Sequence, residues 1–283
     1  MKIIIFFLIA LLTVESTQAL ELKVLWWNVK NFFDTVDDRG KDDDVLTENE
    51  YISKLQSVSG VIKKINADFV GLGEIENIFV LSNIAKSSGY PYYYLEEGND
   101  PRGIDVALLS KYPAVYTSNR DLPTPYDGNP NYKFSRDCPK VEIILENGVK
   151  FYLLLTHLKS KFGGDANSER KRISQIYGIL DILDGIYAEN NEPYVLIMGD
   201  FNSERYSEPM NILEKSGLKN INYLYNEKNI WTTNFGKKKD IDYFLVNEAF
   251  FKKITKYKLK TFGGKYIDKI SDHRPLLLEF SVK

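Results

Sequence analysis

Apolar residues along the chain form short continuous runs that alternate with longer stretches of helical spacing. From Tyr51 to Ile65 they recur three or four positions apart, which predicts a helix over 48–66 with one buried face. The same reasoning predicts a short helix over 78–87 and a second long helix over 167–188. The continuous runs predict strands over 22–27, 69–73, 104–110, 141–145, 149–156, 194–198, 241–246 and 276–282.

These elements indicate a single α/β domain. Many of the strands are apolar along their whole length, so both of their faces should be covered. Asn147-Gly148 separates two of them and is a strong hairpin signal, because both residues tolerate positive φ. No repeat, low-complexity segment or long Pro/Gly linker divides the chain. We therefore expect sheets and helices packed in layers within one domain.

The N-terminus has the pattern of an export signal. Lys2 and the apolar run 3–12 precede small residues at Thr17 and Ala19. The run is shorter than the ~20 apolar residues that span a bilayer. We expect a signal peptide over 1–19 and a folded domain over 20–283, with an uncleaved membrane anchor as the alternative. The mature protein would be secreted or periplasmic, a monomer, and without stable membrane association.

Composition adds two constraints. The chain has 283 residues and a net charge of −2, so no strong overall field draws it to nucleic acid or to an anionic membrane. Its single cysteine, Cys138, cannot form an intramolecular disulfide and is expected to be structural rather than nucleophilic. An exported protein without disulfides must rely on its core or on bound metal for stability.

The chain has only two histidines, and each lies in a short polar cluster beside an apolar strand. His157 lies in Thr156-His157-Leu158-Lys159, and His273 lies in Ser271-Asp272-His273. Histidine is the side chain that can gain or lose a proton near neutral pH, so the pair suggests chemistry. The alternative is that each ring is a hydrogen-bonded part of the core.

Further polar residues fall at the ends of the predicted strands, where α/β folds place their sites. They are Asn28, Glu74, Arg102, Asp105, Lys159, Asp200, Asn202, Asp242 and Asp272. Carboxylates and amides without cysteine suit a hard divalent cation such as Mg²⁺, Mn²⁺ or Ca²⁺. Arginine and lysine suit a phosphate group. Together the residue types point to metal-assisted attack of water on a phosphoester.

These clusters resemble those of the endonuclease/exonuclease/phosphatase superfamily, which includes deoxyribonuclease I. Gly199-Asp200-Phe201-Asn202 and Ser271-Asp272-His273 are the most specific parts of the resemblance. The resemblance runs from about residue 22 to 282 and is strongest toward bacterial extracellular nucleases. It implies a four-layered α/β sandwich, in which two mixed sheets pack together between flanking helices.

The resemblance also implies roles for individual residues. Metal-binding residues would be Asn28, Glu74 and Asp272, with Mg²⁺ as the cofactor and Mn²⁺ or Ca²⁺ as alternatives. Catalytic residues would be His157, Asp200, Asn202, Asp242 and His273. Contacts to phosphate or substrate would come from Arg102, Asp105 and Lys159. We assign the partner of His273 to Asp242 rather than to the nearby Asp240.

Some assignments have open alternatives. Asp105 and Glu76 are both candidate partners for His157, and Arg102 can equally form an ordinary surface salt bridge. The run Asp42-Asp43-Asp44 suits Ca²⁺, although such runs are usually solvated, and we favour solvation. The run Lys237-Lys238-Lys239 suits a nucleic-acid backbone or a solvated turn equally.

The resulting hypothesis is a secreted, divalent-metal-dependent phosphodiesterase that hydrolyses nucleic acid, with DNA as the expected substrate and endonuclease as the expected mode. The first alternative is a secreted phospholipid phosphodiesterase resembling sphingomyelinase, and the second is a phosphatase of a soluble phosphoester. A third, of another class, is a binding module that keeps the fold without the chemistry. That alternative predicts gaps in the set of polar clusters, and the sequence shows none.

Overall fold

Two six-stranded sheets form the centre of the protein. The computed structural model describes residues 19–161, 164–225 and 230–282, so the expected signal peptide lies outside the described residues except for Ala19. Across the first sheet the strands are β11 (Ile254–Thr261), β12 (Leu276–Val282), β1 (Leu20–Phe32), β2 (Phe69–Ile75), β4 (Asp105–Ser110) and β3 (Tyr92–Leu95). Across the second they are β5 (Ala114–Thr117), β6 (Lys140–Ile144), β7 (Lys150–His157), β8 (Val195–Asp200), β10 (Asp242–Val246) and β9 (Lys219–Asn220).

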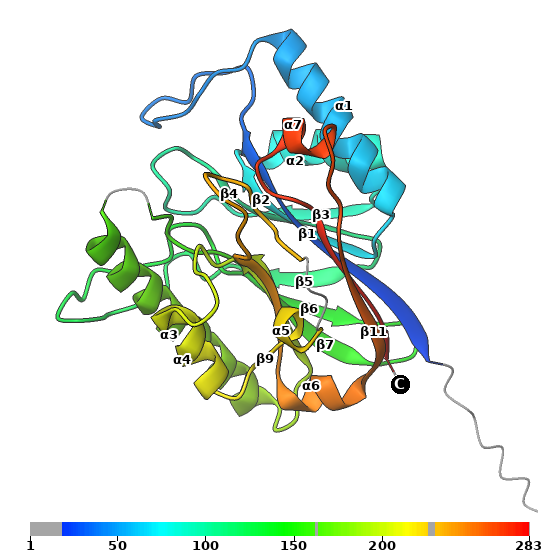
Figure 1. The fold of residues 1–283 in the computed structure, drawn as a ribbon, viewed down its shortest axis with the longest axis vertical. Helices are drawn as coiled ribbons and strands as arrows, with labels where there is room; N and C mark the ends of the chain where they lie inside the picture. Colours follow the sequence, from blue (N-terminus) through cyan, green and yellow to red (C-terminus); the bar gives the residue numbers. More distant parts are fainter. Residues whose placement is uncertain (1–18, 162–163, 226–229, 283) are drawn as a thin grey trace, which may run out of the picture.

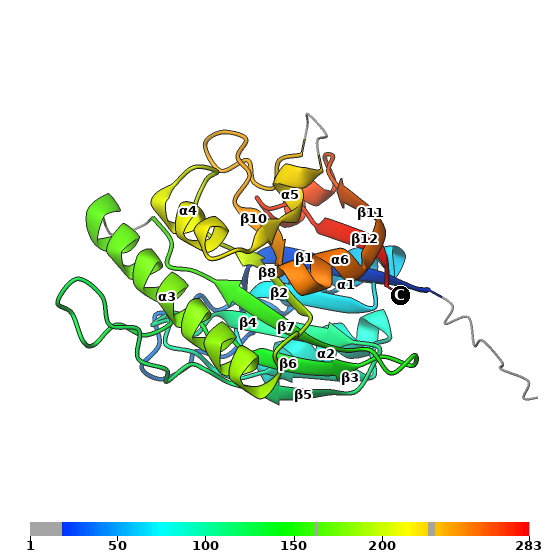
Figure 2. The same cartoon turned by 90° about the horizontal axis from the view of Figure 1, so that it is seen from below.

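The helices cover the outer faces of both sheets. The first sheet packs against α1 (Glu48–Ile65), α2 (Ile78–Ser88) and α7 (Ile267–Ile270), and the second packs against α3 (Asp165–Glu189) and α4 (Glu208–Lys215). The short helices α5 (Ile221–Leu224) and α6 (Glu248–Lys253) lie beside β10 and β11. A third apolar cluster fills the space between the two sheets. The four layers are visible in two perpendicular views (Figures 1 and 2).

Strand direction brings the polar strand ends together. β1 and β2 are parallel, so Asn28 and Glu74 emerge at the same edge of the first sheet. β7 and β8 are also parallel, and their register places His157 opposite Asp200. β10 runs antiparallel to β8 and begins with Asp242, which also lies opposite Asp200. Each sheet therefore presents its chemistry-bearing side chains at one edge.

The sequence predictions hold for the buried elements. The predicted layered α/β fold, its three long or medium helices and its eight apolar strands are all present, although β1 continues to Phe32. The ends of α1 follow from local chemistry, because Thr47 and Glu50 form a capping box and Asn66 adopts a left-handed conformation after the last turn. Cys138 is buried, as expected of a structural cysteine.

The elements missed by the sequence analysis are short or lie at sheet edges. They are β3, β5, β9, β11 and the helices α4 to α7. β11 has the sequence Ile-Thr-Lys-Tyr-Lys-Leu-Lys-Thr and is only partly buried, so it lacks a continuous apolar run. Among the described residues, no helix is both long enough and apolar enough to cross a bilayer.

Candidate active site

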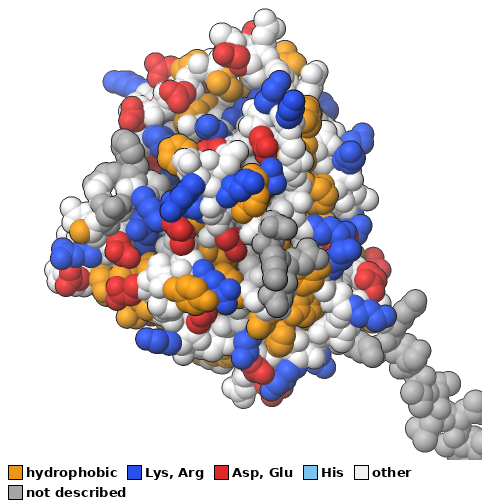
Figure 3. Space-filling model, viewed as in Figure 1, with side chains coloured by type: hydrophobic (Ala, Val, Ile, Leu, Met, Phe, Trp, Pro, Cys, Tyr) orange, Lys and Arg blue, Asp and Glu red, His pale blue; other side chains and the backbone are white. Residues whose placement is uncertain are grey.

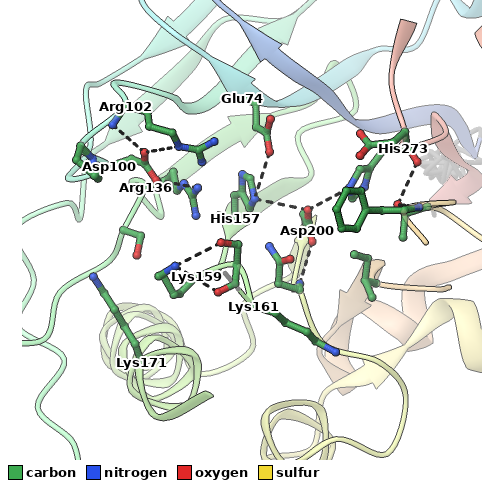
Figure 4. Close-up of a pocket in the computed structure, with 18 of the residues that line it drawn as sticks. Glu74, Asp100, Arg102, Arg136, His157, Lys159, Lys161, Lys171, Asp200 and His273 are labelled. Carbon is green, nitrogen blue, oxygen red and sulfur yellow. Dashed lines mark hydrogen bonds and ion pairs between the residues drawn. The ribbon is translucent and has the colours of Figure 1, made fainter. Parts of the chain in front are cut away.

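A cavity of about 880 Å³ opens between the carboxyl ends of the central strands. Glu74 enters it from the end of β2, and His157 and Asp200 enter it from the ends of β7 and β8. Asp272 and His273 enter from the segment before β12. Figure 4 shows Glu74, His157, Asp200 and His273 along one side of this cavity, so the two sheets contribute jointly to one site.

Asp242 and His273 form a buried pair. The Nδ1 atom of His273 lies 2.8 Å from a carboxylate oxygen of Asp242, whose other oxygen accepts a hydrogen bond of 2.8 Å from the Trp26 indole. Burial alone would lower the pKa of His273, but the charges of Asp242 and Asp200 outweigh it and raise that pKa to about 10. His273 is therefore protonated at neutral pH. Asp242, not Asp240, holds this ring, as the sequence assignment stated.

Asp200 lies between the two histidines. One of its oxygens lies 3.5 Å from Nε2 of His157 and 3.7 Å from Nε2 of His273. The backbone N–H of Asn202 and the Asn28 amide donate to its carboxylate at 2.8 and 3.2 Å. Burial and the charge of Asp242 raise the pKa of Asp200 to about 7, against the opposing effects of His273 and these donors. Asp200 is thus poised to exchange a proton near neutral pH.

His157 differs electrostatically from His273. Its ring is buried, and burial together with the charges of Arg136 and His273 lowers its pKa well below 6.5. The imidazole is therefore neutral, so its approaches to Asp200 and to Glu74, the latter at 4.0 Å, are not ion pairs at neutral pH. Its Nδ1 atom has no hydrogen-bond partner in the part of the chain that the structure describes. The partners expected for it, Asp105 and Glu76, are wrong.

Glu74 is the carboxylate best placed to hold a divalent cation. Its side chain is 16% exposed, and its two oxygens accept hydrogen bonds from the Asn28 amide at 3.1 Å and the Asn31 backbone at 2.7 Å. Within residues 19–161, 164–225 and 230–282, no Lys or Arg forms an ion pair with it. Its backbone φ of 63° is unusual for a non-glycine residue, and such outliers often lie at functional sites.

The surrounding donors fit a hard cation at Glu74. Asp272 also lines the cavity, with 21% of its side chain exposed, and Lys30 lies 3.9 Å from it. Asn28 adds an amide oxygen, which also accepts from the Lys30 backbone at 2.9 Å. Oxygen donors without a thiolate are typical of Mg²⁺ or Ca²⁺ sites. Asp200, Asp242 and His273 also lie within 4.8 Å of one another, and a cation bound there would have to displace the proton of His273.

Asn202 follows Asp200 by two residues and lines the same cavity. Its φ of 48° lies in the left-handed region, where asparagine is more easily accommodated than most residues. Its side-chain amide donates to the Leu158 carbonyl at 3.1 Å, which ties the end of β8 to the segment after β7. Asn202 thus lies beside Asp200, as the sequence motif predicts.

One wall of the cavity is rich in positive charge. Arg102, Lys159 and Lys171 lie with Arg136 on the His157 side of the site (Figure 4). Arg136 is 2% exposed, and one of its nitrogens lies 2.7 Å from Asp100. Sequence reasoning missed Arg136 and Lys171, because neither belongs to a strand-end motif. Arg136 lies between Ser135 and Asp137 in an irregular segment, so the sequence carried no signal of its burial at the site.

Asp105 is not brought to the cavity. It is 1% exposed, and its carboxylate accepts a hydrogen bond of 2.7 Å from the backbone N–H of Gly98. A Cβ on Gly98 would lie 2.4 Å from the same oxygen, so only glycine allows this close approach. Burial raises the pKa of Asp105 to about 7. Its expected contact with substrate is therefore replaced by a structural contact under the loop that carries Arg102.

The opposite rim combines an aromatic residue with lysine. Phe235 lines the cavity and is 76% exposed, and Lys239 also lines it. Their turn is fixed by the bridge between Thr233 and Lys239 and by a hydrogen bond of 3.0 Å from the Thr233 hydroxyl to the Asp272 carbonyl. Lys239 also pairs with Glu204 at 3.2 Å. Of the three consecutive lysines, this one lies at the site.

Comparison with known proteins gives a consistent result. The profile of the Endonuclease/Exonuclease/phosphatase family matches residues 23–251. A truncated TDP2 structure from Caenorhabditis elegans has a TM-score of 0.63 and 19% identity, covering 92% of this chain and 97% of its own. The human Nocturnin catalytic domain with bound sulfate has a TM-score of 0.67 and 18% identity, covering 93% and 95%.

A bacterial structure extends the comparison. An endonuclease/exonuclease/phosphatase family protein from Bacteroides thetaiotaomicron has a TM-score of 0.61 and 13% identity, covering 94% of this chain and 99% of its own. At these identities the likeness establishes the fold, and it agrees with the two mixed sheets and their flanking helices. A search among curated protein sequences finds no significant match.

Proposed function

The chain belongs to the endonuclease/exonuclease/phosphatase family, whose members are phosphoester hydrolases, and from this premise we propose that it is a divalent-metal-dependent phosphodiesterase acting on nucleic acid. The observation that carries the proposal is the arrangement of Glu74, Asp200 and His273 in one cavity beside a positively charged wall. These groups supply a metal ligand, a proton-transfer group and a charged hydrogen-bond donor.

Asp200 is proposed as the base that takes a proton from the attacking water. The donors at Asn28 and Asn202 both favour its ionised form, which accepts their hydrogen bonds. His273 is proposed to donate from Nε2 to a non-bridging phosphate oxygen, while Asp242 fixes the ring from Nδ1. Neutral His157 and the amide of Asn202 are proposed to orient the phosphate from the other side. This arrangement supports the charge that develops on the phosphorus oxygens in the transition state.

A divalent cation at Glu74, with Asp272 and Asn28 as further ligands, would supply Lewis-acid polarisation of the phosphate. The fit rests on the oxygen donors and on the lack of a Lys or Arg partner for Glu74 among the described residues. Mg²⁺ is the proposed cofactor, with Mn²⁺ or Ca²⁺ as substitutes. The chain's own part is to hold these carboxylates at the cavity wall with their hydrogen bonds already formed.

The cavity walls favour nucleic acid as substrate. Arg102, Arg136, Lys159 and Lys171 can hold phosphates of the strand on one side of the scissile bond. On the other side Phe235 offers a face for base stacking. Positive and negative side chains are intermixed on the face seen in Figure 3. Sulfate bound by the Nocturnin domain is consistent with a tetrahedral oxyanion in this fold.

A phospholipid substrate receives less support. A membrane-docking segment needs exposed aromatic residues, but Phe250 of the aromatic pair Phe250-Phe251 is fully buried between the sheets. Figure 3 shows only scattered hydrophobic side chains on the visible face, with no broad apolar area.

We further propose that the protein is exported and acts as a monomer with DNA as its main substrate and endonucleolytic cleavage as its mode. The proposal of export rests on the N-terminal pattern alone.

The test is cleavage by the purified protein of supercoiled plasmid, linear duplex, single-stranded DNA and RNA, with Mg²⁺ and with EDTA. The expected result is nicking of the plasmid that EDTA abolishes and that Asp200→Ala reduces by at least ~10²-fold. Sphingomyelin vesicles and soluble phosphomonoesters serve as competing substrates. Hydrolysis of either one without cleavage of any nucleic acid by the protein in Mg²⁺, Mn²⁺ or Ca²⁺ would reject the proposal.

A further inference from the structure

A second acidic cluster lies away from the catalytic carboxylates. Asp38 and Asp43, in the loop from β1 to α1, approach Glu76 at the end of β2, and one carboxylate oxygen of each lies within 4.8 Å of the others. Figure 1 shows this loop in blue between β1 and α1. Carboxylates at such distances repel one another unless a cation or a proton lies among them.

Glu76 supplies an independent sign of a missing ligand. The residue is 2% exposed, yet its Oε1 atom has no hydrogen-bond partner among the described residues. Its other oxygen accepts hydrogen bonds from the Asp34 backbone at 2.5 Å and from the Asn77 amide at 3.3 Å. Leaving a buried carboxylate oxygen without a partner is costly. The unsatisfied oxygen belongs to the residue that joins the half-buried carboxylates of Asp38 and Asp43 to the core.

No side chain of the protein neutralises this cluster within the described residues. Neither Asp38, Asp43 nor Glu76 forms an ion pair, and the nearby Lys41 pairs instead with Glu97 at 3.9 Å. The nearly buried Asp34 adds a further carboxylate beside Glu76, bridged to it through Asn77. The cluster therefore combines several carboxylates and an orphaned acceptor, and no lysine or arginine of the described residues forms an ion pair with it.

We propose that Asp38, Asp43 and Glu76 form a second, structural divalent-cation site that takes Ca²⁺. Ca²⁺ takes 6–8 oxygen ligands in flexible geometry and often uses several carboxylates, whereas Mg²⁺ keeps several waters and usually takes one or two carboxylates. Three carboxylates within 4.8 Å of one another therefore suit Ca²⁺. Water molecules would complete the 6 to 8 ligands that Ca²⁺ prefers.

The position of the site gives it a structural role. The neighbouring Asp42 donates its backbone N–H to the Pro101 carbonyl at 2.9 Å, and its side chain lines the catalytic cavity. Pro101 precedes Arg102 on the positive wall. An ion between the loop and Glu76 therefore fixes the loop against the end of β2 and, through Asp42, supports the segment that carries Arg102.

The test compares two double variants with the same change in charge. Asp38→Asn/Asp43→Asn removes two of the carboxylates, whereas Asp37→Asn/Asp44→Asn changes exposed residues of the same loop that lie outside the cluster. Calorimetric titration of CaCl₂ into the purified full chain measures the number and affinity of sites. Thermal denaturation with and without CaCl₂ measures the stabilisation that binding causes.

The expected result is that Asp38→Asn/Asp43→Asn weakens one class of Ca²⁺ binding at least tenfold and removes its thermal shift, while the control pair retains both. Glu74→Gln should leave this class intact, which separates it from the catalytic cation. Glu76→Gln keeps the hydrogen bond from the Asp34 backbone. It provides a second measurement of Ca²⁺ affinity and thermal shift if the double variant folds poorly in EDTA. Equal weakening by both pairs, or loss of all Ca²⁺ binding in Glu74→Gln, would overturn the proposal whatever the enzyme's substrate.

Discussion

Asp242 holds His273 through a hydrogen bond of 2.8 Å to Nδ1, and the opposite ring nitrogen then faces Asp200 at 3.7 Å. The contact with Asp242 therefore fixes which ring nitrogen is held, and the other nitrogen, Nε2, is the one that faces the cavity. Trp26 fixes the other oxygen of Asp242, so the orientation of the catalytic ring depends on a tryptophan in the core between the sheets.

The first prediction concerns this pair. Asp242→Asn keeps the size of the side chain but removes the charge that raises the pKa of His273. We expect kcat to fall on the order of 10²–10⁴-fold at pH 8 and the imidazole pKa to fall, which NMR of the His273 ring can follow. The matched control is Asp240→Asn, which touches Asn222 rather than His273 and should leave kcat within a few fold. Equal losses in both variants would contradict the assignment.

The second prediction concerns pH. The pKa of Asp200 is about 7 and that of His273 about 10. If Asp200 acts as the base, activity requires it ionised and His273 protonated, so kcat/KM rises roughly tenfold between pH 6 and 8 and falls again near pH 10. Initial rates at constant ionic strength and saturating Mg²⁺ provide the measurement.

The variant series sharpens the pH test. Asp242→Asn should move the alkaline limb to lower pH, because His273 then loses its proton more easily. The acidic limb, assigned to Asp200, should move less and in the same direction, because the charge of Asp242 raises the pKa of Asp200. A kcat/KM that falls as pH rises from 6 to 8 would instead make Asp200 the acid that protonates the leaving oxygen.

The third prediction concerns the aromatic rim. Phe235→Ala removes a stacking surface without touching the catalytic groups, so KM for single-stranded DNA should rise by about 5- to 150-fold with little change in kcat. Tyr206 is 74% exposed and does not line the cavity, and Tyr206→Ala is the control. Steady-state kinetics on a defined oligonucleotide measures both. An unchanged KM, or a loss in kcat alone, would remove Phe235 from the substrate path.

How much could be predicted from the sequence depends on whether a residue belongs to a periodic pattern or a strand end. His157 and Asp200 were predictable, because each ends an apolar strand and the parallel pairing of β7 and β8 then places them opposite each other. Arg136 and Phe235 were not, because they lie in irregular segments whose path is set by packing. The approach of His157 to Glu74 was not predictable, because it depends on how the two sheets pack together rather than on one sheet's register.

Asp105 shows a different limit. A carboxylate in an apolar strand suggested a functional role, since burying one is costly. In the structure this cost is reduced without a functional role. Burial raises the pKa of Asp105 to about 7, and the carboxyl accepts a hydrogen bond from the Gly98 backbone. A chemically unusual residue next to a predicted site is therefore not necessarily part of it.

The final prediction follows from that pKa. Folded Asp105 holds its proton up to about pH 7, whereas the unfolded chain releases it near the ordinary value of 3.8. Between these values unfolding releases a proton, so this group makes the free energy of unfolding fall as pH rises, by at most about 1.4 kcal/mol per pH unit. Asp105→Asn keeps an oxygen that accepts the hydrogen bond from the Gly98 backbone, and it removes this pH-dependent fall in the free energy of unfolding.

We therefore expect Asp105→Asn to be near neutral in its effect at pH 4.5 and stabilising at pH 8, measured by urea unfolding at both values. Asp181→Asn, an exposed substitution of the same type on α3, should show no such difference. If Asp105→Asn were destabilising at pH 8 by as much as at pH 4.5, the native carboxyl would be ionised and held by a favourable charge. In that case Arg136 and Lys41, the nearby cations that lower the pKa of Asp105, would outweigh its burial.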